Sequence, residues 1–119
     1  MNEDHVLRIP IKAGMTERVR SHLAARGARG EELDKVYAAR SVTRNIAFVS
    51  QEAGEDVLYI YRAGQNLTTA GVKFMLEDSA VDREFARLLL EATEFDQATT
   101  LAVLFRWPPL ENDGSVAGT

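Results

Sequence analysis

The spacing between apolar residues changes along this chain from every second residue to every third or fourth, and the order of those changes limits the folds open to it. Alternation over residues 6–12, 45–51 and 56–62 predicts three strands. Helical spacing over 16–40 and 81–92 predicts helices, with a shorter helical stretch over 69–76. Because Gly27 and Gly30 interrupt the first of these, it is either one kinked helix or two helices end to end.

The last apolar stretch, residues 100–107, predicts a fourth strand that differs from the other three. Apolar residues occupy both of its sides, with Leu101, Val103 and Phe105 on one and Ala102 and Leu104 on the other. A strand with two apolar faces is typical of a position that is buried on both sides. Pro108 then ends the strand, because proline cannot donate to a strand ladder.

The resulting order of elements, βαββαβ, is the ferredoxin-like arrangement of the α+β class. It predicts a four-stranded antiparallel sheet with both helices on one face, strands 1 and 3 at its centre and strand 4 beside strand 1. The other face of the sheet would then be bare, although strand 4 is apolar on both sides. A second copy of the sheet, closing a two-fold homodimer, is the economical way to cover that face.

Length and composition predict the kind of protein. The 119 residues, 45% of them hydrophobic, suit a single domain over 1–110 and a polar tail over 111–119 that we expect to be disordered. No apolar run is long enough for a membrane span and the acidic start does not resemble a signal peptide, so we expect a cytoplasmic protein with no membrane partner. The absence of cysteine excludes disulfides and thiolate chemistry. A net charge of −4 argues against nucleic acid as a partner.

Three segments carry a resemblance to a known superfamily: residues 8–19 (RIPIKAGMTERV), 45–48 (NIAF) and 55–61 (EDVLYIY). In these segments the chain resembles the dimeric α+β barrel superfamily, which includes antibiotic-biosynthesis monooxygenases and polyketide cyclases. More narrowly, it is similar to an uncharacterised family of small bacterial proteins of this type, over about residues 6–107. The resemblance implies a homodimer in which each subunit has a pocket between its helices and its sheet.

The predicted topology gathers several chemically useful side chains at the end of the sheet where strand 1 starts and strands 3 and 4 finish. They are His5, Tyr61, Arg62, Arg106 and Trp107. A histidine there could act as acid or base, an arginine could hold a carboxylate or enolate, and the aromatic rings could line a substrate pocket. The alternative is that they are solvated strand ends with no role.

The helices offer three further candidates. His22 borders the apolar stripe of the first helix, where it could be a general base or a partly buried histidine bonded to a backbone carbonyl. Tyr37 and Arg40 stand three residues apart on the second helical segment. They could present a phenol and a cation over the sheet, or form an ordinary helix edge.

Tyr59 and Tyr61 share one face of the third strand, because side chains two residues apart point the same way. If that face meets the helices, the two tyrosines line the pocket. If it meets a partner subunit, they are interface anchors. Alternation alone does not choose between these two positions.

Nothing in the sequence favours a metal ion or a cofactor. His5 and His22 lie far apart, cysteine is absent, and no glycine-rich phosphate-binding loop is present. The acidic residues around 77–82 could be read as a metal site, but we expect Ser79 and Asp82 to cap the helix that follows.

The favoured hypothesis is a cofactor-independent enzyme, a cyclase, isomerase or oxygenase, that acts on a hydrophobic, aromatic or polyketide-like small molecule. His22 would be its base, Tyr59 or Tyr61 would bond the developing oxyanion and Arg40 would supply charge, while Tyr37 and the sheet-end residues would bind the substrate. The alternative is a non-catalytic small-molecule-binding or structural homodimer. An enzyme should show a polar group with a perturbed pKa facing an apolar cavity, whereas a binder need show only shape and anchors.

Overall fold

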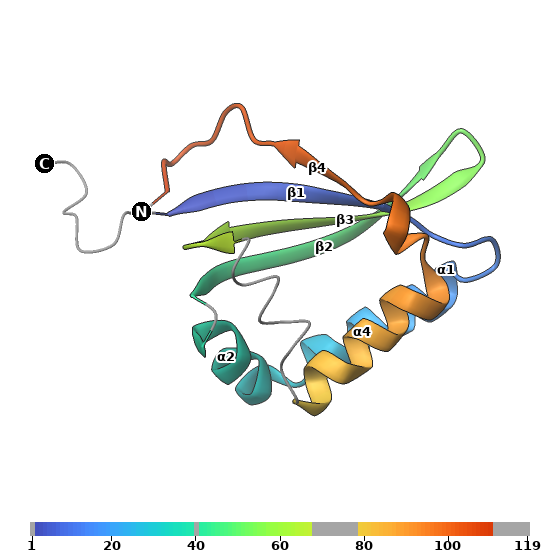
Figure 1. The fold of residues 1–119 in the computed structure, drawn as a ribbon, viewed down its shortest axis with the longest axis horizontal. Helices are drawn as coiled ribbons and strands as arrows, with labels where there is room; N and C mark the ends of the chain where they lie inside the picture. Colours follow the sequence, from blue (N-terminus) through green and yellow to red (C-terminus); the bar gives the residue numbers. More distant parts are fainter. Residues whose placement is uncertain (1, 40, 68–78, 111–119) are drawn as a thin grey trace, which may run out of the picture.

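The structure, a computed structural model, describes residues 2–39, 41–67 and 79–110 (Figure 1). Four strands, three helices and one 3₁₀ turn lie within these ranges. In chain order they are β1 (Glu3–Pro10), α1 (Thr16–Gly27), α2 (Gly30–Ala39), β2 (Val42–Glu52), β3 (Glu55–Gly64), α4 (Ala80–Ala92), η1 (Phe95–Gln97) and β4 (Thr99–Ala102). The helical stretch expected over 69–76 and the tail over 111–119 lie outside the described residues.

The strands form one antiparallel sheet in the order β2-β3-β1-β4, with β1 and β3 in the centre as predicted. Figure 1 shows α1, α2 and α4 on one side of this sheet and no element of the described chain on the other side. The fold is therefore the ferredoxin-like α+β fold that the order of patterns predicted. A tight turn with Gly54 at φ +80° joins β2 to β3, as the hairpin requires.

The helices begin and end where local chemistry favours it. The interrupted helical stretch resolves into two helices, since α1 ends at Gly27 and α2 begins at Gly30. The side chain of Ser79 accepts a hydrogen bond of 3.1 Å from the backbone N–H of Asp82, which caps α4 as expected. No helix within the described ranges is long and apolar enough to cross a membrane.

The core lies between the sheet and the helices. Ile9 of β1 and Leu58 and Ile60 of β3 pack against the apolar stripes of α1 and α4. The buried members of those stripes are Val19, Phe85, Leu88, Leu89 and Ala92. We call the side of the sheet that carries Ile9, Leu58 and Ile60 the covered face.

The opposite side of the sheet, the open face, is apolar and uncovered. The register puts Arg8 opposite Tyr59 and Phe48 beside Tyr59, all pointing away from the helices. The open face also carries Val6, Ile46, Tyr61 and Leu101. Ile46 and Phe48 are 46% and 49% exposed, so large apolar surfaces meet water in a single chain.

The last strand is shorter than the sequence predicted. It ends at Ala102 rather than at 107, and Leu104, Phe105 and Trp107 beyond it are 93%, 84% and 82% exposed. The expectation that this stretch is buried on both sides is therefore wrong for the single chain. The stretch is exposed because, in the described chain, β4 lies at the edge of the sheet and pairs with β1 alone. Beyond Ala102 the chain leaves the strand ladder, and Nε of Arg106 donates to Asp4 at 2.9 Å.

Candidate functional site

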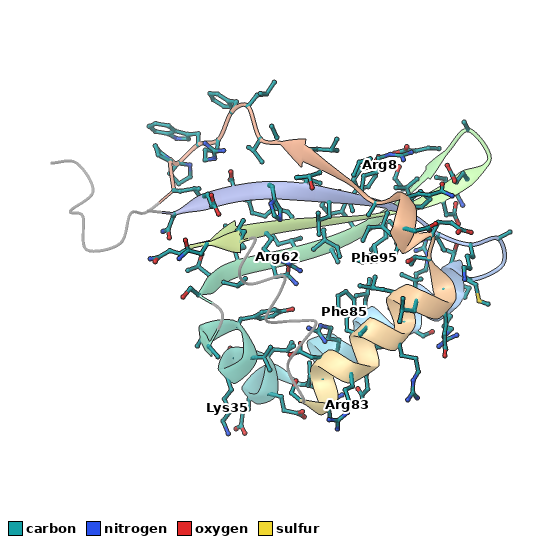
Figure 2. All side chains as sticks on the ribbon, viewed as in Figure 1. Arg8, Lys35, Arg62, Arg83, Phe85 and Phe95 are labelled. Atoms are coloured by element: carbon teal, nitrogen blue, oxygen red, sulfur yellow. The ribbon has the colours of Figure 1, made fainter. Side chains whose placement is uncertain are left out.

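A pocket opens between the helices and the covered face of the sheet. It is partly open to solvent, and its cavity volume is about 210 Å³. It is lined by Leu23, Arg26, Gly27, Leu33, Tyr37, Asn45, Ala47, Ile60 and Phe85. Figure 2 shows Phe85 reaching from α4 into the space beneath the sheet. This is where the superfamily resemblance led us to expect a pocket.

Periodicity explains how these residues meet. Asn45 and Ala47 are two apart on β2 and therefore share its covered face, opposite Arg62 and Ile60 of β3. Leu33 and Tyr37 are one helical turn apart on α2, so they line the pocket from the same side. The pocket thus takes its walls from three helices and two strands.

A chain of hydrogen bonds forms one polar wall of the pocket. The phenol oxygen of Tyr37 accepts from Nη2 of Arg26 at 3.0 Å and from Nδ2 of Asn45 at 2.8 Å. Nε of Arg62 approaches Oδ1 of Asn45 at 3.4 Å. The remaining lining residues are mainly apolar, so the pocket has the form of an apolar cavity with a few convergent polar groups.

Arg26 is buried, with 9% of its surface exposed. Its Nη1 donates to the backbone oxygen of Val81 at 3.2 Å, and its guanidinium lies 4.6 Å from the ring centroid of Phe85 and 5.8 Å from that of Tyr37. Among the described residues no carboxylate lies within 4 Å of it. Its charge is therefore held by neutral oxygens and aromatic faces alone.

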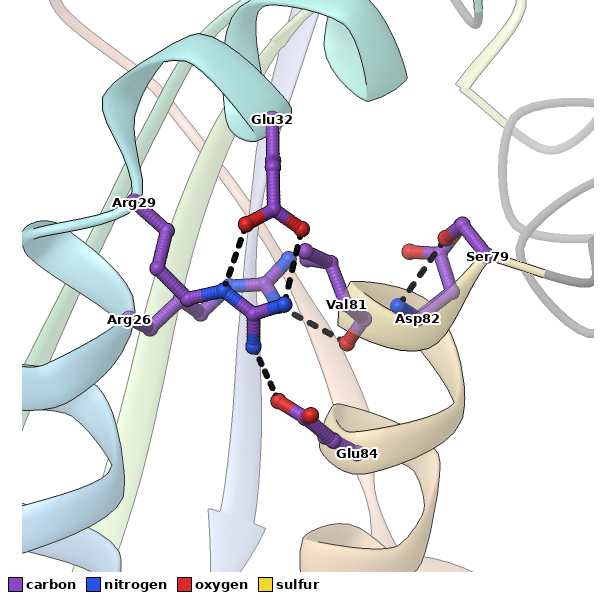
Figure 3. Close-up of polar contacts among 7 residues, drawn as sticks. All are labelled: Arg26, Arg29, Glu32, Ser79, Val81, Asp82 and Glu84. Carbon is purple, nitrogen blue, oxygen red and sulfur yellow. Dashed lines mark hydrogen bonds and ion pairs between the residues drawn. The ribbon is translucent and has the colours of Figure 1, made fainter.

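Arg29, three residues further on, has the opposite surroundings (Figure 3). It donates to both carboxylate oxygens of Glu32, at 3.0 and 2.7 Å, and also to Glu84. Glu32 therefore joins Arg29 to α2 and Glu84 joins it to α4, and within the described residues neither acid pairs with Arg26.

His22 lies on α1 one turn before Arg26; it does not line the pocket itself but contacts Phe85, which does. Its ring stacks on Phe85 with the centroids 5.9 Å apart. Its Nε2 is buried and has no hydrogen-bond partner among the described residues. Burial, and then the positive charge of Arg26, lower the pKa of His22 below its usual value, so the ring is neutral at pH 7 and able to accept a proton.

The two histidines should make stability depend on pH. Burial and the nearby Arg62 lower the pKa of His5, as burial and Arg26 lower the pKa of His22. Because the unfolded chain binds protons at about pH 6.5 and the folded chain binds them at lower pH, stability should be full above that value and fall as pH drops towards about 5. Urea unfolding at a series of pH values measures this fall, and His22→Gln should flatten it. A His22 that titrates above pH 6.5 by NMR would contradict the prediction.

The predicted sheet-end cluster is divided by the sheet. His5 pairs with Arg62 across β1 and β3 on the covered face, and Arg62 in turn contacts Asn45, which lines the pocket from β2. Tyr61 and Arg106 lie on the other side, where both donate to the carboxylate of Asp4. Burial alone would raise the pKa of Asp4, but its bonds from Arg106 and Tyr61 lower it.

Other predicted residues also lie away from the pocket. Trp107 is exposed beyond β4. Tyr59 is on the open face, where it donates to Glu52 and stacks on Phe48 with the centroids 5.6 Å apart. Within one chain the structure does not bring Tyr59 or Tyr61 to His22, because the sheet stands between them. Arg40 lies outside the described residues.

Of the candidates from the sequence, Tyr37 lines the pocket and His22 contacts its residue Phe85, whereas the lining residues Arg26 and Asn45 were not among the candidates. A signal for Arg26 was present, since it follows Val19 and Leu23 at helical spacing and so places a charge on an apolar stripe. Asn45 carries no such signal, because a polar residue at the start of a strand is ordinary. Among the residues that the structure describes, no group of three or more histidine, cysteine, aspartate or glutamate side chains is placed to hold a metal ion.

Comparison with known proteins gives a family without an assigned activity. Among curated proteins no match is found. One family model, described as a family of unknown function (DUF6176), matches residues 3–111, which include every described strand and helix. The chain therefore belongs to this DUF6176 family.

Proposed function

We propose that the chain is a cofactor-independent enzyme that transfers a proton on a small, largely apolar molecule bound in the pocket between the helices and the sheet. The observation that carries the proposal is His22. Its neutral ring packs on the pocket residue Phe85, and its buried Nε2 has no hydrogen-bond partner in the described parts of the chain. A buried nitrogen without a partner is uncommon, and one with a lowered pKa beside a cavity suits a general base.

The chemistry follows from the groups that surround the pocket. His22 takes a proton from a carbon next to a carbonyl, and the electron pair of the broken C–H bond forms the enolate. The polar wall formed by Arg26, Tyr37 and Asn45 would stabilise the negative charge that develops on the enolate. Return of the proton from His22 to another carbon completes an isomerisation. Attack of the enolate carbon on a second carbonyl breaks that C=O π bond, and the resulting alkoxide takes the proton back from His22, which completes a cyclisation.

The apolar part of the pocket indicates the kind of substrate. Leu23, Leu33, Ile60 and Phe85 offer a flat aromatic ring and aliphatic walls. Such a surface suits an aromatic or conjugated molecule, in agreement with the substrates that the superfamily resemblance implies.

We also propose that the protein is a homodimer, joined through the open faces of two sheets. The open face combines an apolar area with two networks of polar groups, Arg8–Glu52–Tyr59 and Asp4–Tyr61–Arg106. Burying the apolar area contributes about 25 cal/mol per Å². A second copy suits this face because it would offer the same apolar area, and the pocket stays free on the covered side.

The test is exchange of the acidic protons of 2-tetralone, a small aryl ketone, for deuterium in D₂O, followed by NMR. The protein should accelerate the exchange above buffer alone, and EDTA should leave the rate unchanged. The probe should shift the amide signals of pocket residues such as Asn45 and Phe85. Shifts at those residues without acceleration would favour the alternative, a small-molecule-binding protein, over the enzyme.

A further inference from the structure

We infer that Arg26 is the recognition residue for an anion, so that the pocket selects small aromatic or conjugated carboxylates over neutral molecules of the same shape. This inference rests on the proposed use of the pocket. It starts from the charge of Arg26, which is buried without a carboxylate near it in the described parts of the chain.

A buried guanidinium without a counter-ion is unfavourable. An arginine cannot lose its proton to escape burial, as a lysine or histidine can, because its pKa is too high. The partners of Arg26, a backbone oxygen, a phenol and two aromatic faces, are all uncharged. The site therefore lacks one negative charge, which an anionic ligand would supply.

Two nearby glutamates show how Arg26 differs from Arg29. Glu32 and Glu84 both reach the same region between α1, α2 and α4, and both bind Arg29 (Figure 3). Arg29 serves the fold by joining the helices at the surface, whereas Arg26 lines the pocket.

The arrangement of donors favours a carboxylate. Nη1 of Arg26 donates to the backbone oxygen of Val81, and Nη2 donates to the phenol oxygen of Tyr37. Asn45 donates to that same phenol oxygen through Nδ2. A ligand oxygen that replaces the Tyr37 oxygen would accept from both donors, and its second oxygen could meet the guanidinium fork. Arg62 on the far side of Asn45 adds further positive charge to this wall. The ring of the ligand would then lie along Phe85 and Leu23.

The experiment compares 2-naphthoate with its neutral analogue 2-acetylnaphthalene by NMR titration of the whole protein. The wild type should bind the carboxylate at least tenfold more tightly, since a hydrogen bond to a charged group commonly contributes a tenfold to hundredfold change in affinity. Arg26→Met should abolish the preference and still bind the ketone. Arg29→Met is the matched control, because it removes a positive charge three residues away and should keep the preference.

Equal binding of the two probes by the wild type, or binding of neither at millimolar concentration, would overturn the inference, and so would a preference that survives in Arg26→Met. The wild-type comparison decides even if that variant does not fold. The deuterium exchange of 2-tetralone is measured separately. Carboxylate preference without catalysed exchange would keep Arg26 as the recognition residue and reject the enzyme. Catalysed exchange without the preference would keep the enzyme and reject Arg26 as the recognition residue.

Discussion

Phe48→Arg should dissociate the proposed homodimer into monomers. Phe48 is 49% exposed in the single chain and stacks on Tyr59 on the open face. In a sheet-to-sheet dimer the new charge would be buried without a partner, which costs several kcal/mol and raises the dissociation constant by on the order of 10³-fold or more. Sedimentation velocity at micromolar concentration measures the change.

Leu90→Arg is the matched control for this substitution. Leu90 is also an exposed large apolar residue, at 65%, but it lies on α4, away from the open face. It should leave the dimer intact, and both variants should keep the secondary structure of the wild type by circular dichroism. A wild-type chain that sediments as a monomer, or a Phe48→Arg chain that remains a dimer, would reject the sheet-to-sheet interface.

The fold was largely predictable because the spacing of apolar residues along the chain shows where strands and helices lie. Alternation located β1 to β3, helical spacing located α1, α2 and α4, and the order of elements then limited the sheet to one arrangement. The stretch after Ala102 was mispredicted because an apolar sequence does not show whether a neighbouring strand is available to pair with it. The open face still carries large apolar and aromatic side chains, but they are those of Ile46, Phe48 and Tyr59 more than those of that stretch.

The site was less predictable because it depends on tertiary packing. Alternation placed Tyr59 and Tyr61 together but could not say on which face, since a period of two gives the same pattern for both faces. The register with β1 decides it, because Leu58 and Ile60 pair with Ile9 and Leu7 on the covered face. Glu32 and Glu84 pair with Arg29 and, within the described residues, not with Arg26, and no local sequence pattern shows which arginine an acid from another helix will pair with.

His22→Ala should slow the exchange of 2-tetralone by about 10²- to 10⁴-fold, the usual contribution of a general base. The reason is that His22 combines a buried, unpartnered Nε2 with a ring that packs on Phe85 at the pocket. The wild-type rate should rise with pH and level off below pH 6.5, because burial and Arg26 lower the pKa of this base. NMR of the probe in D₂O, from about pH 5 to 8, gives both the rate and its pH profile.

His5→Ala is the matched control for the loss of a histidine. His5 also has a buried Nε2 without a partner in the described chain and a lowered pKa, but it lies on β1, beside Arg62 at the end of the sheet. It should keep the exchange rate and the plateau, while His22→Ala should lose both and still bind 2-tetralone. Full exchange in a folded His22→Ala would remove His22 from the mechanism, and a loss confined to His5→Ala would move the base to the end of the sheet.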